Sequence, residues 1–151
     1  MAKSLKRVFF QGSFDLFHYG HLWAIREAKK HGDYLIIALN TDTLYKKYKK
    51  KVPVIKYRYR KEILESLRYV DEVIPISIPQ PLSFLKKLDI DVYITCREWV
   101  FNKQDEINFM KKQGKKVVIL PYLNKLIFST SVLKNYVEHQ KPYCVKCHRK
   151  L

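Results

Sequence analysis

Apolar and polar positions follow two alternating patterns along the chain. Short continuous apolar runs predict strands, and segments in which apolar residues recur every three or four positions predict helices. The predicted strands are 5–10, 34–39, 72–78, 92–95 and 117–120, and the predicted helices are 22–30, 58–67, 81–87, 103–112 and 131–139. Runs such as YLIIAL and VVIL have no polar face, which is typical of parallel strands covered on both sides. We therefore expect an α/β fold, a doubly wound parallel sheet of about five strands with helices on both faces.

The length of 151 residues suits one hydrophobic core. Composition changes only at the end, where HQKPYCVKCHRKL is basic and contains proline. We expect one domain over residues 1–139 and a basic tail over 140–151.

Charge separates classes of partner. The chain has 30 Lys and Arg against 14 Asp and Glu, a formal net charge of +16. Such an imbalance favours an anionic partner, whether nucleotide, nucleic acid or phospholipid surface, without choosing among them.

The apolar run near the N-terminus stops at Gln11-Gly12, too early for the core of a signal peptide. No stretch approaches the roughly 20 apolar residues of a membrane-spanning helix. We expect a cytoplasmic protein whose three cysteines are reduced.

The segment GSFDLFHYGH, residues 12–21, directly follows the first predicted strand. Gly12 allows close approach of the backbone to a ligand, and parallel sheets bind ligands at the carboxyl ends of their strands. His18 and His21, three residues apart, can present both rings on one side, above a helix N-terminus that attracts phosphate. The pattern favours a phosphate-binding site.

Two other readings of this segment remain open. Phe14, Phe17 and Tyr19 could form an aromatic core cluster while the histidines only cap a helix. The histidines could also chelate zinc, although Asp15 is the one further ligand nearby.

Four motifs in order resemble one known family. GSFDLFHYGH resembles the signature of the HxGH nucleotidyltransferase superfamily in its cytidylyltransferase form, and ALNTDTLYKKYKKK, YRYRKEILESLRYVDEVIP and STSVLK follow. The run RYVDEVIP is similar to that of bacterial glycerol-3-phosphate cytidylyltransferases, and the resemblance extends from residue 7 to about residue 138. It implies a Rossmann-like homodimeric enzyme that transfers CMP from CTP to a small phosphorylated alcohol, with Mg²⁺ and release of pyrophosphate.

The resemblance also implies roles for individual residues. His18 and His21 would be catalytic and contact the triphosphate, and the preceding loop would bind the nucleotide through Gly12, Ser13, Phe14 and Asp15.

Three more cations match positions that bind phosphate in the family. Lys49 and Lys51 match when counted back from Arg60, whereas counting from Asp42 falls one residue earlier; the run KKYKKK could instead be a solvated loop. Arg68 is the third, with an ion pair to Asp71 or Glu72 as the alternative.

The segment FSTSVLK is typical of a helix start. Ser129 or Thr130 suits the N-cap, which needs no ligand. By resemblance the same helix start, Ser129, Thr130 and Ser131, also binds the nucleotide phosphates.

The chain departs from the family twice. A Gly-Asp-Asp-Trp run is replaced by Cys96-Arg97-Glu98-Trp99, in which Glu98 and Trp99 keep a carboxylate and the indole for nucleotide binding. The loop PYLNKLIFSTS lacks the family's Arg and Gly and is two residues longer, with Lys125 as a replacement cation. Both changes point to a different acceptor or a lower activity.

The tail contains Cys144, Cys147 and His148 at the spacing of half a zinc knuckle. The same spacing also resembles a haem-attachment motif, which is discounted because haem attachment requires export and the chain shows no export signal. A fourth zinc ligand would have to be His139, Cys96 or a residue of another chain. An unstructured basic tail without metal is the other reading.

Two functions from different classes follow. One is a cytidylyltransferase acting on glycerol 3-phosphate, with ethanolamine phosphate and choline phosphate as further acceptors and ATP ranked behind CTP. A choline group would call for an aromatic cage, for which the chain has 11 tyrosines. The other is a decayed homologue that binds nucleic acid through the tyrosines and cations of residues 45–60.

Overall fold

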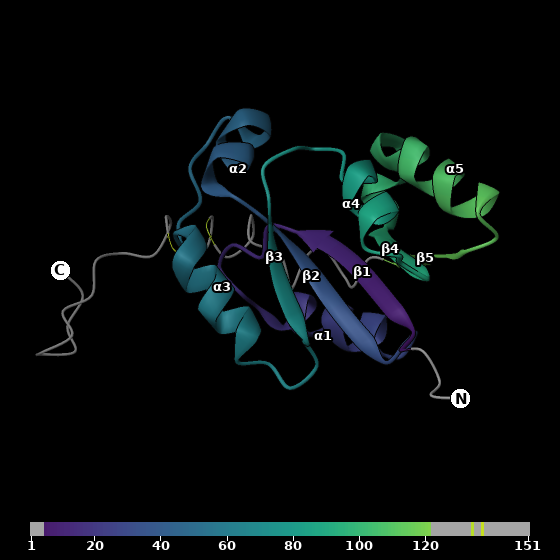
Figure 1. Cartoon of the computed structure of the whole chain (residues 1–151). Coiled ribbons are helices and arrows are strands. Elements are labelled where there is room, and N and C mark those ends of the chain that lie inside the picture. Colours follow the sequence, from purple (N-terminus) through teal and green to yellow (C-terminus); the bar gives the residue numbers. More distant parts are fainter. Residues whose placement is uncertain (1–4, 122–133, 135–136, 138–151) are drawn as a thin grey trace, which may run out of the picture.

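A computed structural model, in which residues 5–121, 134 and 137 are described, contains one five-stranded sheet (Figure 1). Its strands are β1 (Arg7–Gly12), β2 (Tyr34–Asn40), β3 (Glu72–Ile76), β4 (Val92–Cys96) and β5 (Lys116–Leu120). Every pairing is parallel, and the order across the sheet is β3-β2-β1-β4-β5. The predicted fold, a Rossmann-like doubly wound parallel sheet, is confirmed.

Helices cover both faces of the sheet (Figure 1). They are α1 (Tyr19–Lys29), α2 (Asp42–Lys49), α3 (Tyr57–Glu65), α4 (Leu82–Lys87), the 3-10 helix η1 (Arg97–Lys103) and α5 (Gln104–Lys112). Ile25 of α1 and Leu64 of α3 pack on one face, against Phe10. Leu85 of α4 and Met110 of α5 pack on the other. Burial on both faces explains why the strands have no polar side.

Helix α2 is a feature that the sequence pattern did not predict. Thr41 caps its N-terminus, with its side-chain oxygen accepting from the Leu44 N–H, and Lys50 ends it in a left-handed conformation. The interpretation of KKYKKK as a solvated loop is therefore wrong for Lys46–Lys49, which form the last turn of a helix.

Two further boundaries matter for the site. Helix α1 begins at Tyr19, earlier than the predicted residue 22, because His18 serves as its N-cap. The predicted helix 131–139 lies outside the described residues apart from Lys134 and Val137.

The strand order creates a switch point beside β1. The chain runs from β1 outward to β2 and β3, and then crosses back to β4 on the other side of β1. Ligands bind in such α/β sheets at the carboxyl ends of the strands where the direction of winding reverses. The loop after β1 and the start of η1 after β4 flank this crevice.

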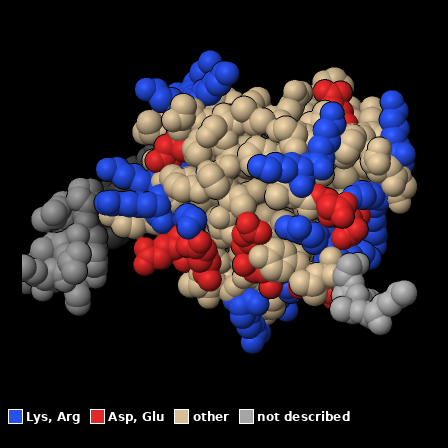
Figure 2. All heavy atoms as spheres, viewed as in Figure 1, with Lys and Arg blue, Asp and Glu red and all other residues tan. Residues whose placement is uncertain are grey.

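On the face drawn in Figure 2, Lys and Arg side chains are spread widely and interspersed with Asp and Glu. Within residues 5–121, 134 and 137, no helix has the length and apolar character needed to cross a membrane.

Candidate active site

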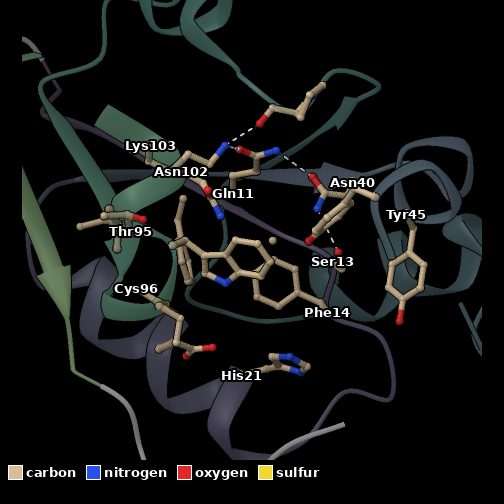
Figure 3. Close-up of a pocket in the computed structure, with 18 of the residues that line it drawn as sticks. Gln11, Ser13, Phe14, His21, Asn40, Tyr45, Thr95, Cys96, Asn102 and Lys103 are labelled. Atoms are coloured by element: carbon tan, nitrogen blue, oxygen red, sulfur yellow. Dashed lines mark hydrogen bonds between the residues drawn. The ribbon is translucent and has the colours of Figure 1, made fainter. Parts of the chain in front are cut away.

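A cavity of about 1270 Å³ opens at the carboxyl ends of β1, β2 and β4, where the topology places a ligand. The loop after β1, the first turn of α1, the end of α2 and helix η1 line it (Figure 3). The predicted site residues that line it are Gly12, Ser13, Phe14, Asp15, His18, His21, Lys49, Lys51, Glu98 and Trp99. The structure thus brings together residues from three separate stretches of the sequence, 12–21, 49–51 and 98–99.

His18 and His21 lie face to face at the start of α1. The ring centroids are 3.8 Å apart and the planes 23° apart. His18 Nδ1 accepts a hydrogen bond from the Gly20 N–H at 3.1 Å, so in the neutral ring the proton is on Nε2. His18 therefore caps the helix and lines the cavity at the same time.

Burial and mutual repulsion keep these imidazoles neutral. Burial, followed by the nearby His18, lowers the pKa of His21 to about 3, against a smaller opposing effect of Asp15. Burial also lowers the pKa of His18. Nδ1 of His21 is out of contact with solvent and has no hydrogen-bond partner among the described atoms. A polar atom left in this state is a ready donor or acceptor for a bound ligand.

Phe14 shapes the loop between the strand and the histidines. Its backbone has a φ of 50°, and its ring packs edge-on against Phe10 and His21, at centroid distances of 5.7 and 5.3 Å. A Cβ at Gly12 would lie 2.6 Å from the Phe14 ring. The Phe14 ring therefore leaves no room for a side chain at position 12. Gly12 also lines the cavity, and the expected close approach of a ligand to its backbone stays a prediction.

Asp15 ties the loop to a distant segment. Its carboxylate is 2% exposed and accepts hydrogen bonds from the N–H groups of Val54 and Ile55, at 3.1 and 3.0 Å, and from the Tyr45 hydroxyl at 3.3 Å. Lys134 lies 3.3 Å away as an ion-pair partner.

These bonds also set the charge state of Asp15. Burial raises its pKa, but the two backbone hydrogen bonds and Lys134 together outweigh burial and hold the pKa below its usual value. Asp15 is thus an ionised structural anchor. Within the described part of the chain no group of three or more His, Cys, Asp or Glu residues is placed to hold a metal ion, which removes the zinc reading of the two histidines with Asp15.

Arg60 is a site residue that sequence reasoning missed. Its side chain is 1% exposed and donates to the carbonyl oxygens of Ser13, Asn40 and Ile55. Its Nη2 atom lies 2.6 Å from Asp42. The one available signal was its position four residues before the buried Leu64 on the same helix.

Sequence reasoning also missed three side chains that are joined to Ser13 by a chain of hydrogen bonds. Lys103 donates to Gln11, Gln11 to Asn40, and Asn40 to Ser13 (Figure 3). Gln11 and Asn40 interrupt apolar strands near their carboxyl ends, which was a usable signal. Nothing in the sequence marks Lys103.

The aromatic residues beside the cavity hold Lys49. Its Nζ atom lies 4.9 Å from the centre of a Trp99 ring and 5.4 Å from the Tyr48 ring. The two aromatic rings meet edge-on at 5.7 Å. Lys49 and Lys51 both border the cavity, so the alignment counted back from Arg60 agrees with the geometry.

Arg68 does not reach this cavity. It follows α3 and precedes the amino end of β3, at the opposite edge of the sheet, and its Nη2 donates to the Tyr69 hydroxyl at 2.8 Å. Asp71 pairs with Lys29 at 2.5 Å, and the described ion pairs include none from Arg68 to Asp71 or Glu72. A catalytic role of Arg68 in the pocket of its own chain is thus not supported, because Arg68 lies near the amino end of β3 and is not among the described residues that line the cavity.

Several predicted residues lie outside the described part of the chain. They are Ser129, Thr130, Ser131, Lys125 and the tail residues His139, Cys144, Cys147 and His148. Cys96 is described and is a free thiol beside the cavity; burial, followed by Glu98, raises its pKa to about 11.

Comparison with known proteins identifies the family. The cytidylyltransferase-like family matches residues 9–136. The chain belongs to this family. It is 42% identical over 116 residues to glycerol-3-phosphate cytidylyltransferase of Staphylococcus aureus, a match that covers 76% of this chain and 84% of that protein. It is 39% identical over 118 residues to the Bacillus subtilis enzyme of the same name, covering 78% and 87%.

Other members extend the range of relatives. A probable ethanolamine-phosphate cytidylyltransferase of Encephalitozoon cuniculi is 40% identical over 87 residues, 58% of this chain and 27% of that protein. Among solved structures, the lipopolysaccharide core biosynthesis protein from Thermoplasma volcanium superposes with a TM-score of 0.66 at 24% identity, covering 80% of this chain and 98% of that one. This last likeness supports the fold alone.

Proposed function

We propose that the protein transfers CMP from CTP to the phosphate of a small alcohol, with glycerol 3-phosphate as the first candidate. An acceptor phosphate oxygen forms a bond to the α-phosphorus while the bond to the β-phosphate oxygen breaks, so pyrophosphate leaves and a CDP-alcohol forms. The observation that carries this proposal is the stacked His18–His21 pair, which faces the cavity at the N-terminus of α1. The two relatives at 42% and 39% identity support the acceptor.

The chemistry requires alignment of two anions and neutralisation of charge, without a covalent intermediate. A triphosphate beside the histidines raises their pKa values, because a nearby negative charge favours the protonated form. The imidazoles then donate to the phosphate oxygens and to the charge that develops on the leaving group. Lys49 and Lys51, which also line the cavity, supply further positive charge.

Mg²⁺ fits this site as a companion of CTP. Magnesium sites commonly combine substrate phosphates with one or two carboxylates, and Glu98 and Asp105 both border the cavity. Asp15 is less suited, since its carboxylate already accepts from Val54, Ile55 and Tyr45. When bound, the ion would screen the triphosphate and stabilise the departing pyrophosphate.

The position of the Lys49 ammonium bears on which alcohol phosphate the protein accepts. The rings of Tyr48 and Trp99 form the kind of aromatic surface that could take a quaternary ammonium group, but the Lys49 ammonium already lies over both rings. A cationic choline or ethanolamine headgroup would meet like charge there. This supports a neutral polyol such as glycerol.

The homodimer and the cytoplasmic location remain predictions, to be tested by light scattering after size-exclusion chromatography and by cell fractionation. The nucleic-acid reading gains no support on the face of Figure 2, where basic side chains form no continuous stripe.

The deciding experiment incubates the protein with CTP, Mg²⁺ and a panel of glycerol 3-phosphate, ethanolamine phosphate and choline phosphate. Pyrophosphate release and the mass of the CDP-product are measured, with His21→Ala as the inactive control. We expect CDP-glycerol from the wild type. The absence of any product, together with salt-sensitive binding to RNA, would refute the proposal.

A further inference from the structure

Lys103 bridges the crevice at the switch point. It is the last residue of η1, which follows β4, and its ammonium donates to the Gln11 Oε1 atom of β1 at 2.8 Å and to the Pro79 carbonyl at 2.5 Å. The residue is 9% exposed, which is rare for lysine. A cation buried in this way normally has a role that offsets the cost of removing it from water.

The ammonium sets the direction of the polar chain that begins at Gln11. Since an ammonium can only donate, the Gln11 oxygen must face Lys103 and its NH₂ group must face away. That group donates to Asn40 Oδ1 at 2.9 Å, so the Asn40 NH₂ group donates onward to Ser13 Oγ at 2.9 Å (Figure 3). One charge therefore fixes two amide orientations and ends at the hydroxyl of Ser13.

Ser13 is held from two sides by buried cations. Its carbonyl oxygen accepts from Arg60, while its hydroxyl accepts from the chain that begins at Lys103. The next residue, Phe14, has the unfavourable φ of 50°. A strained residue persists only where its surroundings determine its conformation strongly, and these two anchors lie directly before it.

Glu106 supplies the countercharge. It lies one helical turn after Lys103, is fully buried, and its Oε1 atom is 3.8 Å from the ammonium. Neither carboxylate oxygen has a hydrogen-bond partner among the described atoms. Burial lowers the pKa of the Lys103 ammonium, and the nearby Glu106 side chain opposes part of this effect.

We propose that Lys103 is a positioning residue for nucleotidyl transfer, which fixes Gln11 and Asn40 and thereby holds the Ser13 hydroxyl in place beside the phosphates of the nucleotide. This role rests on the proposed function. It differs from direct contact with substrate, because the ammonium donates to protein oxygens on Gln11 and Pro79.

The test compares Lys103→Met with Lys112→Met, which removes the same charge from an exposed position on α5. Turnover is measured at saturating CTP and glycerol 3-phosphate, per active site counted by calorimetric titration with CTP. We expect Lys103→Met to lower kcat by at least about 20-fold, with the KM for CTP within about threefold of wild type and no change in Lys112→Met. A kcat for Lys103→Met within about twofold of wild type would overturn the role.

A double-mutant cycle separates positioning from direct contact. Asn40→Leu cuts the same chain further along, so the double variant Lys103→Met/Asn40→Leu should be about as slow as the slower single variant. Losses that multiply would overturn the proposal, since they would show that the two residues act independently. If Lys103→Met fails to fold, Gln11→Leu with Asn40→Leu makes the same comparison, and wild-type turnover in both would be equally adverse.

Amide hydrogen exchange over residues 12–14 gives a readout that needs no activity. We expect faster exchange in Lys103→Met and unchanged exchange in Lys112→Met. A wild-type protein without transfer activity would refute the proposed function, whereas unchanged exchange in Lys103→Met would refute the role of Lys103 whatever the activity.

Discussion

The imidazole rings of His18 and His21 stack at a centroid distance of 3.8 Å, with His18 capping the helix that contains His21. Two rings in such contact cannot both carry a proton at low cost unless an anion lies beside them. Burial lowers the pKa of both imidazoles, and the nearby His18 lowers that of His21 further. In the proposed reaction, the negative charge of a triphosphate would oppose this shift. This coupling links the local helix cap to the chemistry of the site.

Acid should destabilise the folded protein through His21. Its pKa is about 3 in the folded protein against 6.5 for the free side chain, so the unfolded chain binds the proton more readily. The contribution of His21 to the free energy of unfolding is fully present above pH 6.5 and is lost as the pH decreases toward 3. The loss is about 2 kcal/mol at pH 5. Urea unfolding of wild type and His21→Asn between pH 7 and 5 measures this loss.

The matched control is His31→Asn, because the pKa of His31 is also lowered but the residue lies far from the cavity lining. Between pH 7 and 5, the free energy of unfolding of His31→Asn should decrease nearly as much as that of the wild type. An equal loss in His21→Asn and wild type would show that His21 does not remain neutral in the folded protein.

His18 combines two roles that one substitution can separate. Asparagine is a good N-cap, so His18→Asn should keep the free energy of unfolding within about 0.5 kcal/mol of wild type while lowering kcat at least about 100-fold. His18→Ala should lose the same activity and about 1 kcal/mol of stability, because the Gly20 N–H loses its acceptor. Near-normal turnover in His18→Asn would reduce His18 to a helix cap.

The sheet could be predicted from sequence because parallel strands buried on both faces appear as continuous apolar runs. Helix α2 could not, since only Leu44 and Tyr45 of its eight residues are buried and the remainder is polar. The position of the histidines followed from their place after the first strand. The anchoring role of Asp15 could not be predicted, because its partners Val54 and Ile55 are 39 and 40 residues away.

Long-range pairing also explains why Lys103 was overlooked. Its partner Gln11 is 92 residues away, and a lysine in a polar helical segment is ordinarily a solvated residue. Arg68 is an example of the opposite error. A local match to a motif assigned it to the cavity, whereas the topology places it near the amino end of β3, away from the carboxyl ends of the strands.

Arg60 should be essential for stability. Arg60→Met leaves the carbonyl oxygens of Ser13, Asn40 and Ile55 without their donor, which should cost about 3 kcal/mol or more. Arg58→Met, an exposed change on the same helix, should cost less than about 0.5 kcal/mol. Denaturant unfolding monitored by circular dichroism decides, and equal stability of the two variants would contradict the anchoring role.

Lys49 should act on the nucleotide through its charge. Its ammonium lies over Trp99 and Tyr48 at the cavity wall, whereas Lys46 on the same helix is exposed and is not among the described residues of the lining. Lys49→Met should raise the KM for CTP about tenfold, the effect of losing one charge-assisted hydrogen bond, while Lys46→Met leaves it unchanged. Increasing the salt concentration should weaken CTP binding more in wild type than in Lys49→Met, since screening acts on a charge that the variant lacks. The KM values of the two variants at low and high salt check this, and equal values would assign Lys49 to the solvated surface.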